Sequence, residues 1–456
     1  MKICFLLLLL TGCTSLAPEY TRPTPLIPTG WDFFNNSQQE NDISLDTQQG
    51  KASRETSWKN YFKSPELQKI IEAAISYNHS LRIAVLNVQS ARALYQIDFA
   101  NLLPRAGISI EGSKQSMANM TAYKANITPT FEIDLFGRLQ SENDSALESY
   151  FATESARDAA QIILIAETAN AYIQWLADNK ILHITEDILK NKQKFYDIMK
   201  HNYHNGVADD VMLAEASSAL ERARGDHALY IRHVQEDENA ILLLVGQKNK
   251  ELVISKNLDH LEIIKNLPEG LSSSILLERP DIVQQEHKLK AANAHIGAAR
   301  AAFFPKISLT GTYGFMSSSL ANLFSSSSGG AWSFTPQLSL PIFEGGANMA
   351  NLELSEIRKE IAIIQYEELV ERAFREVANA LLTTQELNTQ KNAHRQLVKD
   401  QEKTCNIISM GYKLGIESLL KYLQAEYELH LVQIKFIDVQ KKSFMNIVNL
   451  YKVLGL

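Results

Sequence analysis

Side chains suited to catalysis or metal binding are few and scattered in this sequence. His201 and His204 are spaced to share one helix face, as two imidazoles do when they bind a metal. We interpret them instead as solvent-exposed polar residues. Glu426 and Glu428 have no partner arrangement that indicates acid/base catalysis. The sequence has no phosphate loop, dinucleotide fingerprint, metalloprotease motif or nucleophile elbow, so we predict no enzyme activity, cofactor or metal.

The N-terminus carries a modification signal. Met1-Lys2 and the short apolar run to Leu10 are typical of an export signal, and about eight apolar residues are too few to cross a bilayer. Leu10-Thr11-Gly12-Cys13 resembles the lipobox of bacterial lipoproteins, which implies cleavage before Cys13 and a diacylglycerol on its thiol. A chance cysteine after an ordinary signal peptide is the alternative. Thr14, in place of aspartate, favours sorting to the outer membrane.

Composition indicates an ordered chain without affinity for nucleic acid. Of 456 residues, 45% are apolar and 21% are charged, which fits a sizeable buried core. The net charge of −7 provides no basic surface for a phosphate backbone. Cys4 lies in the signal and Cys13 would be acylated, so only Cys405 remains and no internal disulfide is expected.

The predicted strands and helices occur twice along the chain. A strand that alternates apolar and polar residues passes into a long helical pattern at Thr128–Gly137 and again at Thr335–Gly346, which indicates a tandem duplication. The predicted organisation is a signal peptide (1–12), an extended lipid-anchored tether (13–60), a first repeat (61–250), a linker (251–279) and a second repeat (280–456).

Each repeat is predicted to contain a helix, two strands and a pair of long helices. The first helix is expected to run from Pro65, behind the capping Ser64, to Leu102. The long helix from Arg138 is about 100 Å long at 1.5 Å per residue, which is too long for a membrane span and must cross an aqueous space. Its apolar residues recur at coiled-coil spacing: Ile162, Ala166, Ala169, Ile173 and Leu176.

Matching glycines end the long helices. Tyr203-His204-Asn205-Gly206 corresponds to Tyr412-Lys413-Leu414-Gly415, and glycine permits the left-handed backbone of a chain reversal. We therefore predict that Tyr203, Gly206, Tyr412 and Gly415 form two tip turns. Helix-ending glycines without a further role are the alternative.

The four predicted strands each have an apolar and a polar face. Trp332, Phe334, Leu338, Ile307 and Leu309 are expected to face lipid, and Thr310, Thr335 and Gln337 to face a lumen. Four strands cannot close a barrel, and open edges are not tolerated within a membrane. Two copies would give eight strands and three copies twelve; this argument does not choose between them.

Several motifs resemble those of TolC-like outer-membrane factors, in family order over essentially the whole mature chain. The similarity is to the lipoprotein branch of resistance-nodulation-division (NodT-type) efflux systems. One departure is Glu278, since relatives often have two arginines before Pro280-Asp281-Ile282. The motifs are Trp58–Leu67, Asp134–Arg138, Glu278–Ile282, Ala294–Ala298 and Phe303–Pro305.

The resemblance implies a mixed α and β membrane protein and its function. Three copies form a twelve-stranded β-barrel in the outer membrane, four strands per chain, which continues into a long periplasmic α-helical barrel. The strand–helix junctions lie at Pro104, Gly137, Pro305 and Gly345. The implied function is a passive export duct for small toxic compounds. Its implied partners are a periplasmic adaptor, an inner-membrane resistance-nodulation-division transporter and outer-membrane lipid.

The resemblance also implies an aperture formed by the helix after the second tip, where relatives often carry acidic residues. Glu417, Lys421 and Gln424 share one face of that helix here. Because Lys421 and Gln424 partly replace the usual acids, we predict ion pairs between Glu417 and Lys421, within or between protomers. Packing of the neighbouring leucines is the alternative gate.

Two other functions would account for some of these sequence features. An outer-membrane duct for type I protein secretion would share the strands and helices, although the lipobox argues against it. A lipid-anchored periplasmic enzyme or coiled-coil scaffold would not need four strands with a lipid-type face.

Overall fold

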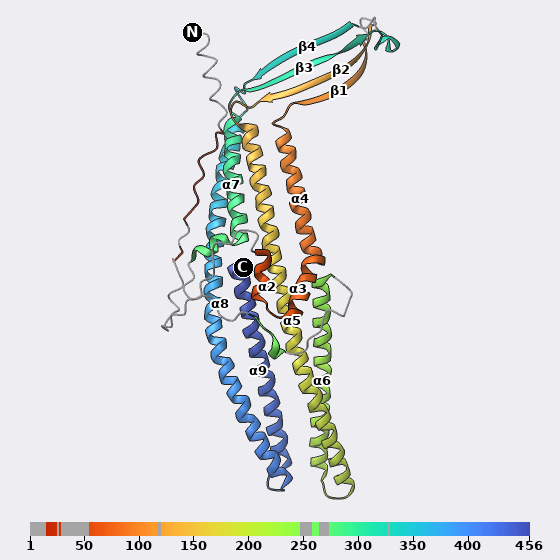
Figure 1. Ribbon diagram of the computed structural model, residues 1–456, viewed down its shortest axis with the longest axis vertical. Coiled ribbons are helices and arrows are strands. Elements are labelled where there is room, and N and C mark those ends of the chain that lie inside the picture. The colour runs from red at the N-terminus through yellow and green to blue at the C-terminus, as the bar shows by residue number, and fades with distance from the viewer. Residues whose placement is uncertain are drawn as a thin grey trace. The chain divides into compact units, whose positions relative to one another are not determined.

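The computed structural model describes residues 15–24, 27–28, 54–115, 120–246, 258–263, 273–325 and 329–456, so the signal peptide, Cys13 and most of the tether lie outside the described residues. The elements run in this order (Figure 1): α2 (Arg54–Tyr61), α3 (Pro65–Tyr77), α4 (His79–Ala100), β1 (Arg105–Gln115), β2 (Met120–Ile133), α5 (Arg138–His204), α6 (Asp210–Val245), η4 (Leu258–His260), η5 (Ser273–Glu278), α7 (Pro280–Ala301), β3 (Lys306–Ser317), η6 (Leu320–Asn322), β4 (Gly329–Ser339), α8 (Ala347–Lys413) and α9 (Leu419–Leu454).

Three helices recur in the same order and at the same lengths in the two repeats. α4 and α7 each have 22 residues. α5 and α8 each have 67 residues, and α6 and α9 each have 36. This agreement supports the tandem duplication, while the exact repeat boundaries stay a prediction.

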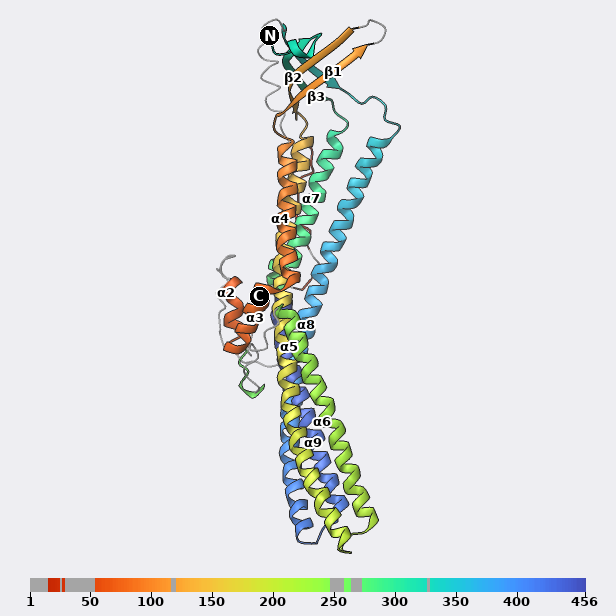
Figure 2. The same ribbon diagram turned by 90° about the vertical axis from the view of Figure 1, so that its right-hand side faces the viewer.

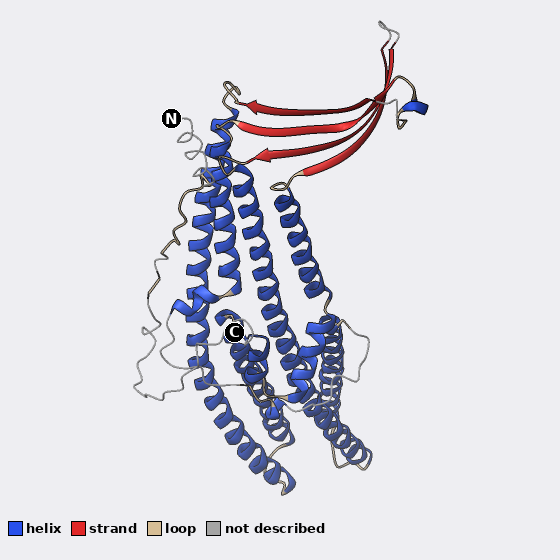
Figure 3. Ribbon diagram, turned by 45° about the horizontal axis from the view of Figure 1, so that its top comes forward, coloured by secondary structure: helices blue, strands red, loops and turns tan. Residues whose placement is uncertain are grey.

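The four strands form one antiparallel sheet in the order β1-β2-β3-β4 (Figure 3). β1 pairs with β2 and β3 with β4 within each repeat, and β2 pairs with β3 between the repeats. β2 ends at Ile133, because Asp134 leaves the strand to cap α5. β1 and β4 are the two edges of the sheet.

The chain forms two compact units, and each unit contains parts of both repeats. The first comprises the described parts of residues 1–26, 85–156 and 281–369, and the second comprises those of 27–84, 157–280 and 370–456. In the first unit, α7 lies between α5 and α8 (Figure 2). His287 Nδ1 is 2.6 Å from Glu148 Oε2 on α5, and Gln285 Nε2 donates to Gln365 Oε1 on α8 at 3.1 Å.

The second unit holds the largest core. Four of the five predicted coiled-coil residues of α5 are buried there, with Ala169 and Ile173 fully inaccessible to solvent, and Ile162 is partly buried against the same core. They pack with Phe62, Ile70 and Tyr451 from the other elements of the unit. The Tyr61 hydroxyl donates a hydrogen bond to the carbonyl oxygen of Ile447 at 2.8 Å, which fixes α2 to α9.

The predicted single helix over 65–102 is wrong, because it is interrupted at Asn78. Asn78 has an extended backbone, with ψ of 128°, and separates α3 from α4. Its side-chain oxygen accepts from the amide of Leu81 at 3.1 Å, and its side-chain nitrogen donates to the carbonyl of Leu244 at 2.8 Å. Asn78 thus caps α4 and binds the end of α6 at once. Among the described helices, none combines the length and the apolar character of a membrane span.

Candidate functional site

The strand register gives the sheet one apolar and one polar face. Ile108 and Trp332, at the two edges, are 78% and 77% exposed. Thr312 Oγ1 lies 2.6 Å from Ser333 Oγ on the polar face. The predicted division of residues between the faces therefore agrees with the pairing. One apolar row is Ile108, Ile127, Tyr313 and Trp332, another is Ile133, Ile307 and Leu338, and a polar row is Thr130, Thr310 and Thr335.

The first strand–helix corner, residues 134–138, explains the Asp-Leu-Phe-Gly-Arg motif. Asp134 accepts the backbone amides of Arg138 and Gln140, both at 2.8 Å, and so caps α5. Gly137 has a φ of 67°, which favours glycine. The Arg138 guanidinium lies 2.6 Å from Glu132 at the end of β2 and 3.0 Å from Glu142 on α5. The motif therefore fixes the direction in which the helix leaves the strand.

The second corner, residues 340–346, has a different construction. Gly345 and Gly346 have φ of 59° and 89°, and the Ala347 amide donates to the carbonyl of Glu344 at 3.0 Å to start α8. Pro104 and Pro305 precede β1 and β3 directly, where the missing N–H removes no ladder bond. The structure thus places all four predicted junction residues between a strand and a helix.

The two predicted tip turns have the same backbone bonds. Gly206 and Gly415 have φ of 70° and 71°, and each donates to the tyrosine three residues earlier, Tyr203 or Tyr412, at 3.0 Å. The tyrosine rings differ in surroundings. Tyr412 stacks on Tyr422 with ring centroids 5.3 Å apart, whereas Tyr203 is 37% exposed. The stacked Tyr412 ring therefore packs the second turn against α9, whereas the Tyr203 ring of the first turn is exposed.

Of the three predicted aperture residues, the structure pairs two. Lys421 Nζ donates to Glu417 Oε1 at 2.7 Å within one chain, and the two side chains are 54% and 30% exposed. Glu417 also packs over Gly411, where an added Cβ would lie 2.7 Å from Glu417 Cγ. Gln424 instead lines a groove of about 670 Å³ whose walls come from α5, α6 and α9.

A buried ion pair borders this groove and was not predicted from the sequence. Lys192 Nζ on α5 donates to Glu426 Oε2 on α9, and the side chains are only 8% and 12% exposed. His430 lies in the same region, and burial lowers its pKa, with Glu426 opposing the shift. The Cys405 thiol is buried and its pKa is raised by desolvation, so it is a packed side chain.

The sequence signal for the burial of Lys192 is its heptad position. Thr185, Lys192 and Met199 follow one another at steps of seven, and all three are buried.

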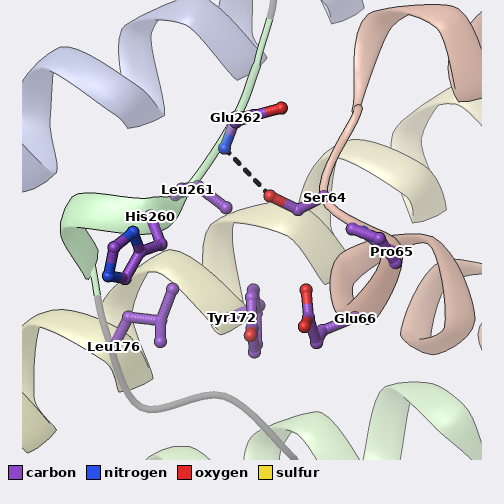
Figure 4. A pocket seen from close by; sticks show the side chains of 8 residues that line it. All are labelled: Ser64, Pro65, Glu66, Tyr172, Leu176, His260, Leu261 and Glu262. Carbon is purple, nitrogen blue, oxygen red and sulfur yellow. Dashed lines mark hydrogen bonds between the residues drawn. The ribbon is translucent and has the colours of Figure 1, made fainter.

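A second cavity, of about 240 Å³, lies where α3, α5 and the segment after η4 meet (Figure 4). Ser64 Oγ accepts the backbone amide of Glu262 at 2.9 Å, and the Lys63 amide donates to the Glu262 carbonyl at 3.0 Å. Burial, with the charge of Glu66, raises the pKa of Tyr172 to about 12, so this phenol remains neutral. These bonds hold the segment to α3, and we interpret the cavity as a structural joint.

The segment after Cys13 lies along α7. Ser15 Oγ is 2.8 Å from Ser141 Oγ, and the Pro18 carbonyl accepts from Asn293 at 2.7 Å. Arg22 forms an ion pair with Glu286. An added Cβ at Gly297 would lie 2.7 Å from the nitrogen of Ala17, which explains the glycine in the Ala294–Ala298 motif. Cys13 itself is outside the described residues.

The remaining candidates for chemistry stay apart. His201 and His204 are exposed. Across the described ranges, no group of three His, Cys, Asp or Glu side chains could hold a metal ion. Glu426 is paired with Lys192, and no described contact joins it to Glu428.

Comparison with known proteins identifies the family. The model of the outer membrane efflux protein family matches residues 70–247 and 271–456. The probable efflux pump outer membrane protein TtgC of Pseudomonas putida is 37% identical over 462 residues, covering 98% of this chain and 93% of that protein. The cation efflux system protein CusC of Escherichia coli is 36% identical over 454 residues, covering 98% and 97%.

A solved structure agrees over nearly the same length. The open state of the MtrE outer membrane channel of Neisseria gonorrhoeae has a TM-score of 0.84 and 33% identity, covering 97% of this chain and 98% of that chain. Sequence motifs, fold and chain length thus lead to one family. The chain belongs to the family of outer membrane efflux proteins.

Proposed function

We propose that three copies of this chain form an outer-membrane duct that exports small toxic compounds. The observation that carries the proposal is the sheet, which has a continuous apolar face and two edges without a partner strand among the described residues. Unpaired backbone groups are too costly in hydrocarbon, so β4 of each copy pairs with β1 of the next until a barrel closes. Three copies give twelve strands, whose polar face lines an open lumen.

The helices of the first unit support the same closure. α4 and α8 carry large apolar side chains that a single chain leaves in water. Packing of α8 on α4 of the next copy would bury both faces and continue the barrel as a helical duct through the periplasm. The exposed fractions are 59% for Leu86, 61% for Ile97, 71% for Met349 and 63% for Ile364.

The names of the relatives favour efflux over protein secretion. TtgC is named for an efflux pump and CusC for a cation efflux system, so the cargo class is small compounds or ions. We propose that a periplasmic adaptor and an inner-membrane resistance-nodulation-division transporter complete the pump. A lipid on Cys13 would anchor the segment that lies along α7, and Cys13→Ala should abolish labelling by a fatty-acid probe.

We propose that the periplasmic end closes at the turn between α8 and α9. Glu417, just before α9, and Lys421, in its first turn, form an exposed ion pair there, while Gln424 lines the neighbouring groove. An exposed pair contributes under about 1 kcal/mol, so helix packing must contribute the rest of the closure. Lys421→Glu should raise the single-channel conductance in planar bilayers. Unchanged conductance would place the gate in the packing of the neighbouring leucines.

The duct itself is tested in cells that lack the chain. Their sensitivity to a panel of antibiotics, detergents and metals should rise, and the full chain should restore resistance. Outer-membrane fractions should contain a trimer that dissociates on heating before electrophoresis. A monomer in those fractions, together with unchanged sensitivity, would overturn the proposal. Loss of a secreted protein without any change in drug or metal sensitivity would instead favour the secretion duct.

A further inference from the structure

A contact between the two repeats closes the first strand–helix corner. The Phe136 ring stacks on the Phe304 ring, with centroids 4.5 Å apart and an interplanar angle of 19°. Phe136 follows the end of β2, and Phe304 precedes the start of β3. The pairing of Ile133 with Ile307 brings these two positions together. The stack therefore joins the corner after β2 to the corner before β3.

Both halves of this contact occur a second time in the sequence. Thr128-Pro129 and Phe136 correspond to Thr335-Pro336 and Phe343, with the same spacing and apolar residues at the same steps between them. Leu102-Leu103-Pro104 corresponds to Phe303-Phe304-Pro305. The duplication thus predicts a second contact, between Phe343 and Leu103.

The chain does not make this second contact internally. Phe343 is 89% exposed, Ile342 is 93% exposed and Leu103 is 50% exposed. Their strands, β4 and β1, are the opposite edges of the sheet. Leu103 and Phe343 belong to the same compact unit. Within one chain, the width of the sheet therefore separates them.

We propose that Phe343 of one copy packs on Leu103 of the next copy and so joins the corner after β4 to the corner before β1. This inference rests on the ring closure given above as the proposed function. The partner is a second copy, because only another copy supplies the Leu102–Pro104 corner beside a free β1 edge. In the closed ring, each copy contributes Phe343 to one neighbour and Leu103 to the other.

The faces of the strands agree with this contact. Transferring the β2–β3 register to the β4–β1 pair places Leu340 opposite Ala106 and Leu338 opposite Ile108. Both pairs lie on the apolar face, so that face continues across the junction between copies. The hairpins β1–β2 and β3–β4 differ in register by two residues, and a shift of two also preserves the faces.

A cysteine pair tests the contact directly. Full-length chains carrying Leu103→Cys and Phe343→Cys, with Cys405→Ala to remove the native thiol, should form disulfide-linked dimers and trimers in oxidised outer-membrane fractions. A disulfide requires Cα atoms about 4.4–6.8 Å apart. The matched control pairs Phe343→Cys with Ile97→Cys, because Ile97 is 61% exposed but lies inside the last turn of α4, six residues before Leu103. The control pair and each single cysteine should remain uncrosslinked.

A gain-of-contact variant gives a second readout. Leu103→Phe recreates the Phe136–Phe304 pair between copies and should raise the temperature at which the trimer dissociates. The gain should disappear when Phe343→Ala is added. If the trimer forms but the 103/343 pair does not cross-link and the gain survives Phe343→Ala, the corner contact is wrong while the duct stands. If the unmodified chain forms no trimer, the proposed function itself fails.

Discussion

Asp237 on α6 is a half-buried carboxyl group beside a buried one, Asp178 on α5. Burial, the charge of Asp178 and a hydrogen bond to it raise the pKa of Asp237 to about 7. Lys441 on α9 opposes the shift, and the neighbouring Glu236 adds to it. Oδ2 of Asp237 is buried without a hydrogen-bond partner. The folded chain therefore holds a proton here that the unfolded chain releases near the ordinary value of 3.8.

This proton makes stability depend on pH in a defined direction. Between the two pKa values the folded state binds more protons than the unfolded state, so the free energy of unfolding falls as pH rises to about 7. Asp237→Asn keeps the neutral shape, and it should raise the melting temperature at about pH 8 but much less at about pH 5. The exposed Asp226→Asn is the control. An equal effect of Asp237→Asn at both pH values would contradict the raised pKa of Asp237.

The Lys192–Glu426 pair should behave unlike the Glu417–Lys421 pair. Removing either partner of a buried pair leaves an uncompensated charge and costs about 3–5 kcal/mol. Lys192→Met and Glu426→Leu should each approach that loss in thermal denaturation, and the double variant should lose less than their sum. Lys421→Ala should cost under about 1 kcal/mol, because its pair is exposed. Additive losses at Lys192 and Glu426 would show that the two charges do not interact.

Among single residues, the sequence predicted the exposed side chains of the strands better than the buried polar side chains of the helices. The alternation along the strands has a period of two, so Trp332 and Thr335 could be assigned to opposite faces before the register was known. Lys192 was missed because a lysine in a helical pattern is ordinarily solvated, and only its heptad position places it in a seam. Phe136 was placed next to the corner glycine, but its partner Phe304 is remote in sequence and could not be inferred.

Among the elements, the ends of the helices depend on glycine in two different ways. Gly206 and Gly246 both have left-handed backbones, with φ of 70° and 67°. An added Cβ at Gly206 meets nothing within 4 Å, whereas at Gly246 it would lie 2.6 Å from the carbonyl oxygen of Tyr77. The second position therefore combines backbone strain with a clash against backbone atoms.

Alanine substitutions should separate these two effects. Gly206→Ala should cost about 1–2 kcal/mol, the ordinary penalty for a left-handed non-glycine residue. Gly246→Ala should cost clearly more, because α3 must move away from the end of α6. Thermal denaturation of the two purified variants measures the difference. Equal losses would mean that the contact with Tyr77 relaxes freely.

The break between α3 and α4 shows where local patterns stop being sufficient. Residues 65–102 have an uninterrupted helical pattern without proline or glycine after the first position. The interruption at Asn78 is held by its bond to Leu244, at the end of a helix from a distant part of the sequence. Elements with a strong period and clear caps, such as α5 and α8, were predictable. This break was not, because a tertiary contact imposes it.

At the scale of the whole molecule, the orientation of the barrel is the central prediction. Phe334 lies on the apolar face in the middle of β4, and Thr335 follows it on the polar face. An arginine on the lipid face near the midplane costs about 2–4 kcal/mol, while a lumen position accepts it. Phe334→Arg should therefore lower the amount of heat-dissociable trimer in outer-membrane fractions, and Thr335→Arg should leave it unchanged. The reverse result would mean that the apolar face lines the interior.

The equal lengths of α5 and α8, and of α6 and α9, have an evolutionary consequence. Each repeat keeps its turn glycine at a fixed count of residues from its strand–helix corner. An insertion in one repeat alone would desynchronise the two turns, and one that is not a multiple of seven would also rotate the buried seam out of register. Selection should therefore accept length changes as matched pairs of whole heptads, so the ancestral duplication still constrains how its two descendants can diverge.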